Sequence, residues 1–242
     1  MYIIRNLSRL VNSFPAVPDK MACKRRVQVI YWSNYRIKEW VCLLRYILCA
    51  VLGYLLGSFS ASILISKYIF RRDVRKSGSG NAGAANTARV FGIGAGLLTL
   101  GGDFLKCLIA MLLTRALAGE LGMCVGGMTC MLGHCFPLYF HFRGGKAVAT
   151  GAAVALLIDW RVLAIALAVY LLAAVLFRFA SLASLCAAAA IPVSSLILSV
   201  SMPRLVLAIF TFVLVTVMHR GNIARLLAGT EPKFSFGTRP TK

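Results

Sequence analysis

Acidic residues are scarce in this sequence. Only 7 of its 242 residues are Asp or Glu, against 27 Lys and Arg, and the four charged types together make up 14% of the chain. A soluble domain of this length carries a far larger charged fraction, which excludes a soluble protein. So few carboxylates also exclude a catalytic site for divalent metal ions, which prefer oxygen ligands of this kind. We therefore expect neither a metal nor a cofactor.

Cysteines at metal-binding spacing are also missing. The eight cysteines include no CxxC pair, and seven of them lie in apolar segments. Buried thiols of this kind act as small hydrophobic side chains. The pattern excludes a disulfide framework and a thiolate metal site.

Long apolar runs are abundant instead. Hydrophobic residues make up 60% of the chain, and the mean hydropathy is +0.81. Runs that approach or reach the length needed to cross a membrane occur at 46–66, 90–114, 121–140, 147–158, 162–177, 179–203 and 205–218. They predict an all-α fold, a polytopic membrane helix bundle of about seven transmembrane helices. The number is five if the short fourth and fifth runs are re-entrant.

Positive charge is distributed unevenly between the connections. With seven alternating spans, one side receives 67–89, 141–146, 178–184 and 219–242, which carry fourteen Lys and Arg. The internal connections on the other side carry three. The positive-inside rule makes the first side cytoplasmic. The N-terminal segment opposes this orientation, because it carries nine Lys and Arg up to Arg45.

The first forty residues differ from the rest of the chain. They are basic and lack the apolar stretch of a signal peptide. We therefore divide the chain into an atypical basic extension, 1–40, and a membrane domain, 41–242. Two interpretations of the extension stay open. It is an amphipathic surface segment, or it follows a start assigned upstream of the true one, with Met21 as an internal candidate.

The net charge of +20 would suggest a nucleic acid partner in a soluble protein. Here the cations fall between apolar spans, and no aromatic stacking residues alternate with them. We expect membrane lipids and an anionic substrate as partners, and no nucleic acid.

A glycine-rich stretch, RKSGSGNAGAANTAR at 75–89, lies between the first two spans. It matches GxGxxG formally, but the strand and βαβ unit of a dinucleotide fold are not expected around it. Glycines let successive N–H groups turn toward one point, and a helix starting near Val90 or slightly earlier would add its positive end. The stretch predicts a phosphate site whose candidate residues are Gly78, Ser79, Gly80, Asn81, Asn86 and Arg89. The alternative is a flexible loop that touches lipid head groups.

Two further polar stretches lie on the same predicted side. The first, 133–151, has the sequence GHCFPLYFHFRGGKAVATG and predicts a second phosphate site at Gly144, Gly145 and Lys146. We interpret His134 as a structural residue. MHRGNIARLLAGTEPK, 218–233, spaces His219, Asn222 and Arg225 so that the first two share a helix face. A solvated helix end is the alternative for the last stretch.

Smaller polar features accompany these stretches. Ser181 and Ser184 share a face in the connection between them, where structural roles are common. Asp103 and Lys106 are one helical turn apart inside a span. They predict an ion pair, because an unpaired charge at that depth is costly.

Together the three stretches resemble the bacterial membrane glycerol-3-phosphate acyltransferase family that uses acyl phosphate as donor. The family's motifs are similar to GSGNAGAAN…R (78–89), GHCFP…F.GGKAVATG (133–151) and HRGNI.RLL.GTEPK (219–233), in the same order. The resemblance runs from about Val51 to Lys233. Two departures stand out. Ala85 replaces the usual Thr, and Phe59-Ser60 replaces the frequent Ile-Pro.

The resemblance implies a reaction. A fatty acyl group passes from acyl phosphate to the 1-position of glycerol 3-phosphate, giving 1-acyl-glycerol 3-phosphate (lysophosphatidic acid) and inorganic phosphate, the first acylation of phospholipid synthesis. It implies an acyltransferase of the bacterial inner membrane with a cytoplasmic active site, linked to an enzyme that supplies acyl phosphate. Catalytic roles fall on Ser79, Arg89, Lys146, His219 and Asn222. Substrate or phosphate binding falls on Gly78, Gly80, Asn81, Asn86, Gly144, Gly145, Ser181, Ser184 and Arg225.

Other functions fit the sequence less well. A His with Asp five positions later, usual in acyltransferases that use soluble donors, is missing, because Tyr139, Lys146 and Ala224 stand five residues after the three histidines. A membrane transporter of a phosphorylated solute is the chief alternative. Its path would need polar groups at mid-membrane, where only Asp103 and Lys106 are candidates. A purely structural scaffold leaves three glycine-rich cationic motifs unexplained.

Overall fold

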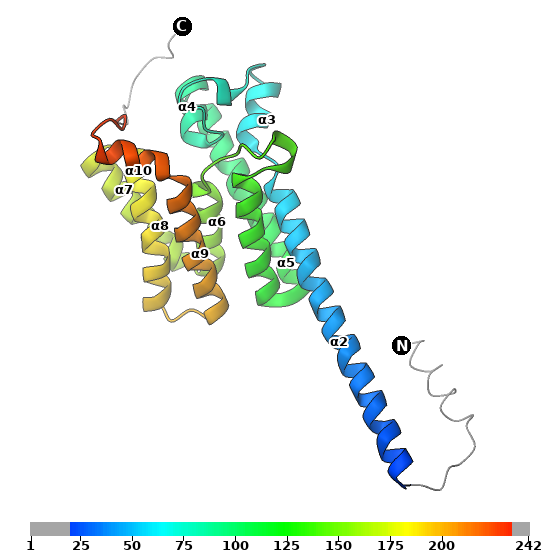
Figure 1. Ribbon diagram of the computed structural model, residues 1–242. Coiled ribbons are helices and arrows are strands. Elements are labelled where there is room, and N and C mark those ends of the chain that lie inside the picture. The colour runs from blue at the N-terminus through cyan, green and yellow to red at the C-terminus, as the bar shows by residue number, and fades with distance from the viewer. Residues whose placement is uncertain (1–19, 234–242) are drawn as a thin grey trace. The chain divides into compact units, whose positions relative to one another are not determined.

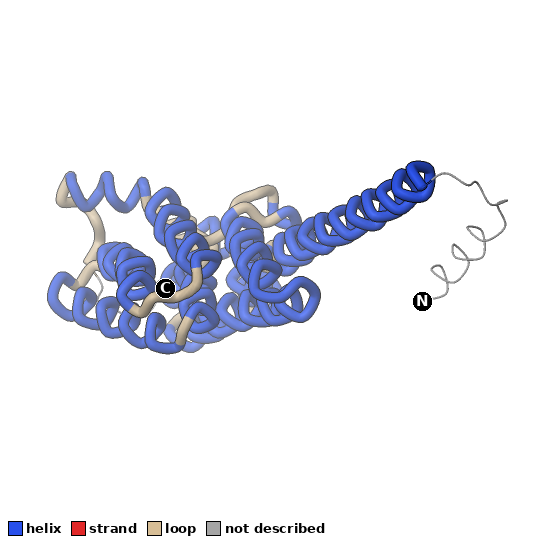
Figure 2. Tube along the Cα trace, turned by 90° about the horizontal axis from the view of Figure 1, so that it is seen from below, coloured by secondary structure: helices blue, strands red, loops and turns tan. Residues whose placement is uncertain are grey.

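The computed structural model describes residues 20–233, with side chains from residue 39 onward. Every regular element in this part of the chain is a helix, and the loops are short (Figures 1 and 2), which confirms the all-α class. The α-helices are α2 (Lys20–Gly57), α3 (Ala61–Tyr68), α4 (Ala84–Phe91), α5 (Ile93–Cys135), α6 (Val148–Ile158), α7 (Trp160–Phe177), α8 (Ala180–Ile197), α9 (Met202–Met218) and α10 (Arg220–Leu227). Two short 3-10 helices, η1 (Val74–Lys76) and η2 (Leu138–Phe140), lie in the connections.

The chain divides into two compact units, 1–44 and 45–242. The three polar motifs all lie in the second unit. The predicted extension, 1–40, lies largely outside the residues whose side chains are described, and its role stays a prediction.

Helix α5 folds back on itself. Its geometry is interrupted at Ala118–Gly119, where the glycine has a φ of +65°. Beyond the break, Gly126 lies so close to Thr114 that a Cβ on the glycine would overlap that side chain. The two limbs, 93–117 and 120–135, therefore run antiparallel. They correspond to the second and third expected spans.

Small residues bring helix α2 against the second limb of α5. A Cβ on Gly53 would overlap Gly126 and Thr129, and a Cβ on Gly57 would overlap the backbone of Cys130. These two glycines allow the backbones of the two helices to approach closely.

Within residues 20–233, four helices are long and apolar enough to cross a membrane, and a fifth crossing results if α9 and α10, bent by 60°, form one broken span. The expected number of seven is not confirmed. Helix α5 counts here as one continuous element, and α6 has 11 residues, about 17 Å at 1.5 Å per residue, against a hydrocarbon layer of about 30 Å. The class, a membrane helix bundle, is unaffected.

The first expected span, 46–66, is broken in its middle. Helix α2 ends at Gly57, and α3 begins at Ala61, whose N–H donates to Oδ1 of Asp103 at 3.3 Å. Lys106 Nζ lies 2.8 Å from the same oxygen, so the predicted Asp103–Lys106 ion pair is confirmed. A buried carboxylate of α5 thus holds the point where the first span restarts.

A second ion pair lies at the far turn of α5. Glu120 pairs with Arg204 at 2.8 Å, and Arg204 Nη1 also donates to the carbonyl of Ile158 at 2.9 Å. This pair ties the turn of α5 to the start of α9 and the end of α6.

Candidate active site

Asn86 holds the first glycine-rich loop together. Its buried side chain accepts the N–H of Ser79 on Oδ1 at 2.8 Å. Its Nδ2 donates, at 3.0–3.1 Å, to three backbone carbonyls, those of Val74, Ser77 and Asn81. Gly78 and Gly80 have φ of +61° and +71°, which lets the backbone turn around this amide. Asn86 thus supports the loop from within.

Helix α4 begins directly after this loop, with Gly83 as its N-cap. The first bonds to the Gly83 carbonyl come from the third and fourth helical residues, so the N–H groups of Ala84 and Ala85 are available to an anion. The expected start near Val90 is corrected to Ala84. A separate helix forms there because Gly92, with a φ of +94°, divides α4 from α5. The positive end of α4 therefore adjoins the loop itself.

Exposed polar groups surround this helix start. The side chains of Ser79 and Arg89 are exposed, and Asn81 is half-buried. Arg75, at the start of the glycine-rich stretch, pairs with Asp73 at 2.8 Å and donates to the Phe140 carbonyl at 2.9 Å. Hydrogen bonding from Arg75 lowers the pKa of Asp73 to about 2. The Arg75 charge is thus balanced, and its guanidinium ties the first loop to the second.

The second loop is docked onto the end of α5. The N–H of Gly144 donates to the Cys135 carbonyl, and that of Gly145 to the His134 carbonyl, both at 3.1 Å. A Cβ on Gly145 would overlap the His134 ring and come within 2.8 Å of the Ala82 carbonyl. The sequence predicted these glycines as permissive positions of a phosphate cradle. The structure requires them for close contact and gives both N–H groups protein partners.

Lys146 follows these glycines and reaches the third motif. Its Nζ donates to Oδ1 of Asn222 at 2.5 Å, and Asn222 Nδ2 donates to Oε1 of Glu231 at 2.6 Å. Burial lowers the pKa of Lys146, and the charges of Arg225 and Arg89 lower it further, against the opposing effect of Glu231. Cations from all three motifs therefore act on one another at this place.

Glu231 accepts several hydrogen bonds that the sequence did not predict. Ser181 Oγ donates to Oε1 at 2.6 Å, and Arg225 Nε donates to Oε2 at 2.7 Å, in addition to the Asn222 bond. Burial alone would raise the pKa of Glu231, but these hydrogen bonds hold it below its usual value. The signal in the sequence was a single carboxylate within a cationic motif. It organises the third motif and joins it to α8.

His219 lies at the bend between α9 and α10. Its buried ring places Nδ1 2.8 Å from the Val215 carbonyl. In the neutral ring this bond puts the proton on Nδ1 and leaves Nε2 as an acceptor. Asn222 follows one turn later on α10, as the spacing predicted.

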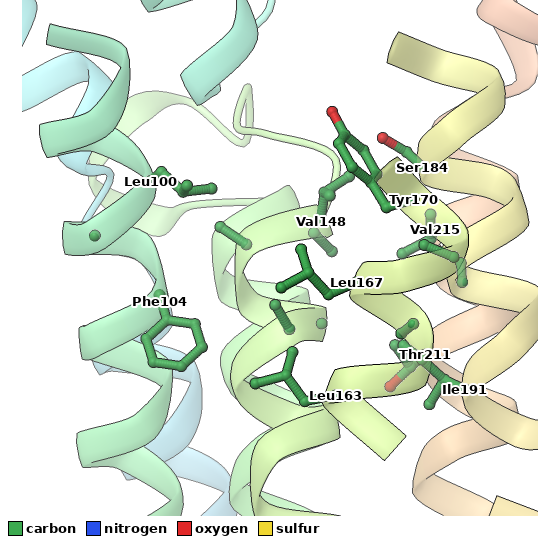
Figure 3. Close-up of a pocket in the computed structure, with 18 of the residues that line it drawn as sticks. Leu100, Phe104, Val148, Leu163, Leu167, Tyr170, Ser184, Ile191, Thr211 and Val215 are labelled. Atoms are coloured by element: carbon green, nitrogen blue, oxygen red, sulfur yellow. The ribbon is translucent and has the colours of Figure 1, made fainter. Parts of the chain in front are cut away.

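A cavity of about 420 Å³ begins directly behind Lys146. Ala147 and Val148 form part of its wall, and the remaining lining comes from α5, α6, α7, α8 and α9 and is almost entirely apolar. Figure 3 shows the hydroxyls of Tyr170 and Ser184 at one end, and Phe104, Leu163 and Ile191 toward the other. Ser184 Oγ also donates to the Ala180 carbonyl at 2.8 Å, within its own helix. Lys146 thus directly precedes the residues with which the second loop enters the wall of an apolar chamber.

Residues 47–229 match the family model of glycerol-3-phosphate acyltransferases. This chain belongs to the glycerol-3-phosphate acyltransferase family. It is 42% identical over 188 residues to the glycerol-3-phosphate acyltransferase of Mesorhizobium japonicum, covering 77% of this chain and 95% of the relative. Glycerol-3-phosphate acyltransferase 2 of Bacillus anthracis is 37% identical over 189 residues, covering 77% and 98% of the two chains.

Solved structures of the family have the same fold. PlsY (YgiH), an integral membrane glycerol 3-phosphate acyltransferase, matches in its glycerol 3-phosphate form with a TM-score of 0.75 and 33% identity, over 78% of this chain and 96% of PlsY. Its lysophosphatidic acid form matches with a TM-score of 0.73 and 32% identity. This acyltransferase is accordingly an integral membrane enzyme of phospholipid synthesis.

Proposed function

We propose that this acyltransferase moves a fatty acyl group from acyl phosphate to the 1-hydroxyl of glycerol 3-phosphate. The products are lysophosphatidic acid and inorganic phosphate. The observation that carries the proposal is the apolar cavity that begins behind Lys146, lined by Ala147 and Val148. A reactant with a phosphate at one end and an acyl chain at the other fits a site with cations at one end and an apolar chamber at the other.

The reaction balances without a further reactant. The acceptor oxygen forms a bond to the acyl carbonyl carbon, the bond from that carbon to the phosphate oxygen breaks, and inorganic phosphate leaves. Negative charge develops on the carbonyl oxygen and on the leaving phosphate. Arg89 and Lys146 stabilise this charge, because cations fixed in advance act more strongly than reorganising water.

The other motif residues bind and orient. Ser79, Asn81 and the first N–H groups of α4 face one phosphate, and Asn86 with Gly78 and Gly80 shapes the loop that presents them. Gly144 and Gly145 place Lys146, while Asn222 holds its ammonium group at 2.5 Å. Ser181 and Arg225 act through Glu231, at 2.6 and 2.7 Å. Ser184 lies in the cavity wall, where the acyl chain enters.

The proton of the acceptor hydroxyl has two possible destinations. His219 Nε2 is one, because Nδ1 is engaged by the Val215 carbonyl. A substrate phosphate oxygen is the other, and we favour it, because the surrounding cations disfavour a protonated histidine. His219 then orients the acceptor together with Asn222.

We also propose the bacterial inner membrane as the location, with the site on its cytoplasmic face. The three motifs gather at one end of the second unit (Figure 1), the end whose connections carry most Lys and Arg. Membrane lipids surround the helices. Another reaction must supply acyl phosphate. An enzyme that phosphorylates a fatty acid, or that transfers a fatty acyl group to phosphate, therefore acts upstream.

Phosphate release separates this function from transport of a phosphorylated solute. The purified chain in liposomes should release inorganic phosphate from palmitoyl phosphate only when glycerol 3-phosphate is present, without flux of either solute across the bilayer. Arg89→Ala should abolish release. Arg178→Ala removes another exposed cation outside the three motifs and should leave release unchanged. Flux without acceptor-dependent release would support the transporter.

A further inference from the structure

Three titratable side chains are buried together beneath the second loop. Asp103 is 1% exposed and His134 3% exposed, and the Lys106 side chain is 11% exposed. A charged pair buried in a membrane bundle gives little net stability and is commonly retained for a functional reason. The steps described above use none of the three.

The group connects three parts of the chain. Lys106 Nζ donates to Oδ1 of Asp103 at 2.8 Å and to the Phe59 carbonyl at 2.5 Å, and lies 3.0 Å from Nδ1 of His134. Asp103 also accepts the N–H of Ala61 at 3.3 Å. The two limbs of α5 and the break between α2 and α3 therefore meet at one ammonium group and one carboxylate.

The contact with Lys106 also fixes the state of the His134 ring. Nδ1 lies 3.5 Å from Oδ1 of Asp103 but only 3.0 Å from Lys106 Nζ. Because the nearer ammonium group only donates hydrogen bonds, Nδ1 of the neutral ring accepts, and its proton lies on Nε2. Nε2 is the ring atom that lies against Gly145, where a Cβ would overlap it. The His134 carbonyl accepts the N–H of the same glycine at 3.1 Å. His134 thus contacts Gly145 through both its ring and its backbone.

Gly145 is also a place where the two loops lie close together, in addition to the hydrogen bond from Arg75 to the Phe140 carbonyl. A Cβ added to Gly145 would lie only 2.8 Å from the carbonyl oxygen of Ala82 in the first loop. A shift of the His134 ring would move Gly145, and with it both the spacing of the loops and the position of Lys146.

We propose that Asp103, Lys106 and His134 form a positioning cluster for the catalytic loops. The Asp103–Lys106 pair locks the orientation and tautomer of His134, and the ring sets the place of Gly145 and hence of Lys146. None of the three contacts substrate in this role. The inference rests on the proposed function, because its effect is read as binding and turnover of the two phosphate substrates.

The test is His134→Gln, which leaves the Asp103–Lys106 pair intact and so creates no unpaired buried charge. A displacement of about 1 Å at a positioned group can lower the rate by about a hundredfold. In His134→Gln we expect kcat/KM to fall by about tenfold to a hundredfold, through a higher KM for one of the two substrates. Gly145→Ala should raise the KM for the same substrate. The double variant should lose no more than the worse single variant, because both act through one contact.

The matched control is Glu120→Gln. It breaks the other charged pair of α5, with Arg204 at 2.8 Å, and should change neither KM. Unchanged kinetics in His134→Gln, additive losses in the double variant, or losses that follow only the amount of folded protein would overturn the proposal.

A second variant covers the case in which His134→Gln does not fold. Asp103→Asn combined with Lys106→Met removes both charges and keeps the ring. It should raise the same KM, and an unchanged KM would contradict the positioning role. Wild-type protein without acceptor-dependent phosphate release would instead refute the proposed function, which keeps the two failures apart.

Discussion

Replacing Glu231 with Gln tests the organisation of the third motif. The side chain is 6% exposed and accepts hydrogen bonds from Ser181, Asn222 and Arg225 at 2.6–2.7 Å. In the variant, the Gln side chain keeps most hydrogen bonds when its amide oxygen faces Ser181 and Asn222 and its NH₂ group faces Arg225. Two charge-assisted bonds then become neutral, with a loss of about 1 kcal/mol each. The half-exposed Arg225 pair adds about 0.5 kcal/mol.

The free energy of unfolding should therefore fall by about 2–3 kcal/mol in Glu231→Gln. For a chain of this size that corresponds to a decrease in Tm of roughly 4–12 °C. Asn222 would also lose part of its support, so Lys146 would be held less well and phosphate release should fall more than tenfold at a temperature where the variant is folded.

The measurement combines thermal unfolding in detergent with acceptor-dependent phosphate release. Glu120→Gln is the control, since it changes the same residue type in the Arg204 pair far from the site. If Glu231→Gln matched that control in both Tm and activity, the assignment of Glu231 as organiser of the motif would be refuted.

Four further predictions follow from the site. Gly145→Ala should lower kcat/KM about a hundredfold, whereas Gly94→Ala, where an added Cβ meets nothing within 4 Å, should leave kcat/KM unchanged. His219→Gln should keep a measurable fraction of activity, and complete loss of turnover with intact substrate binding would restore its role as general base. Ala188→Phe narrows the cavity and should lower kcat/KM for palmitoyl phosphate about tenfold or more while sparing a butyryl donor; equal losses would contradict the acyl chamber. The pKa of Asp73 is lowered to about 2. Its contribution to stability is therefore full above about pH 4 and disappears as the pH falls toward 2. Asp73→Asn should have a lower Tm than wild type at pH 7, and the difference in Tm should shrink in acid.

Much of the site was predictable from residue types and their order. The cations of 78–89, 144–146 and 219–225 meet at one end of the bundle, because the motifs stand in connections separated by even numbers of spans. The Asp103–Lys106 pair followed from helical spacing and the energetic penalty of an unpaired charge in a membrane. These inferences needed only local patterns.

Contacts between distant segments were not predictable in this way. Asn86 was expected to bind phosphate, but its amide fits carbonyls of its own loop. Gly144 and Gly145 were expected as flexible positions, and only the packing of the loop on α5 shows that close contact requires them. The role of Glu231 was not predictable, because its hydrogen-bond partners come from α8 and α10. The number of seven spans is not confirmed, because α6 has only 11 residues and α9 and α10 are bent by 60°.

One measurement tests the central proposal most directly. The purified protein is given palmitoyl phosphate and labelled glycerol 3-phosphate, and both lysophosphatidic acid and inorganic phosphate are quantified over time. We predict that the two products form in equal amounts, and that neither forms when palmitoyl-CoA replaces the acyl phosphate or when Arg89 is changed to Ala. Lysophosphatidic acid formed from the CoA donor, or phosphate released without an acylated product, would contradict the proposal.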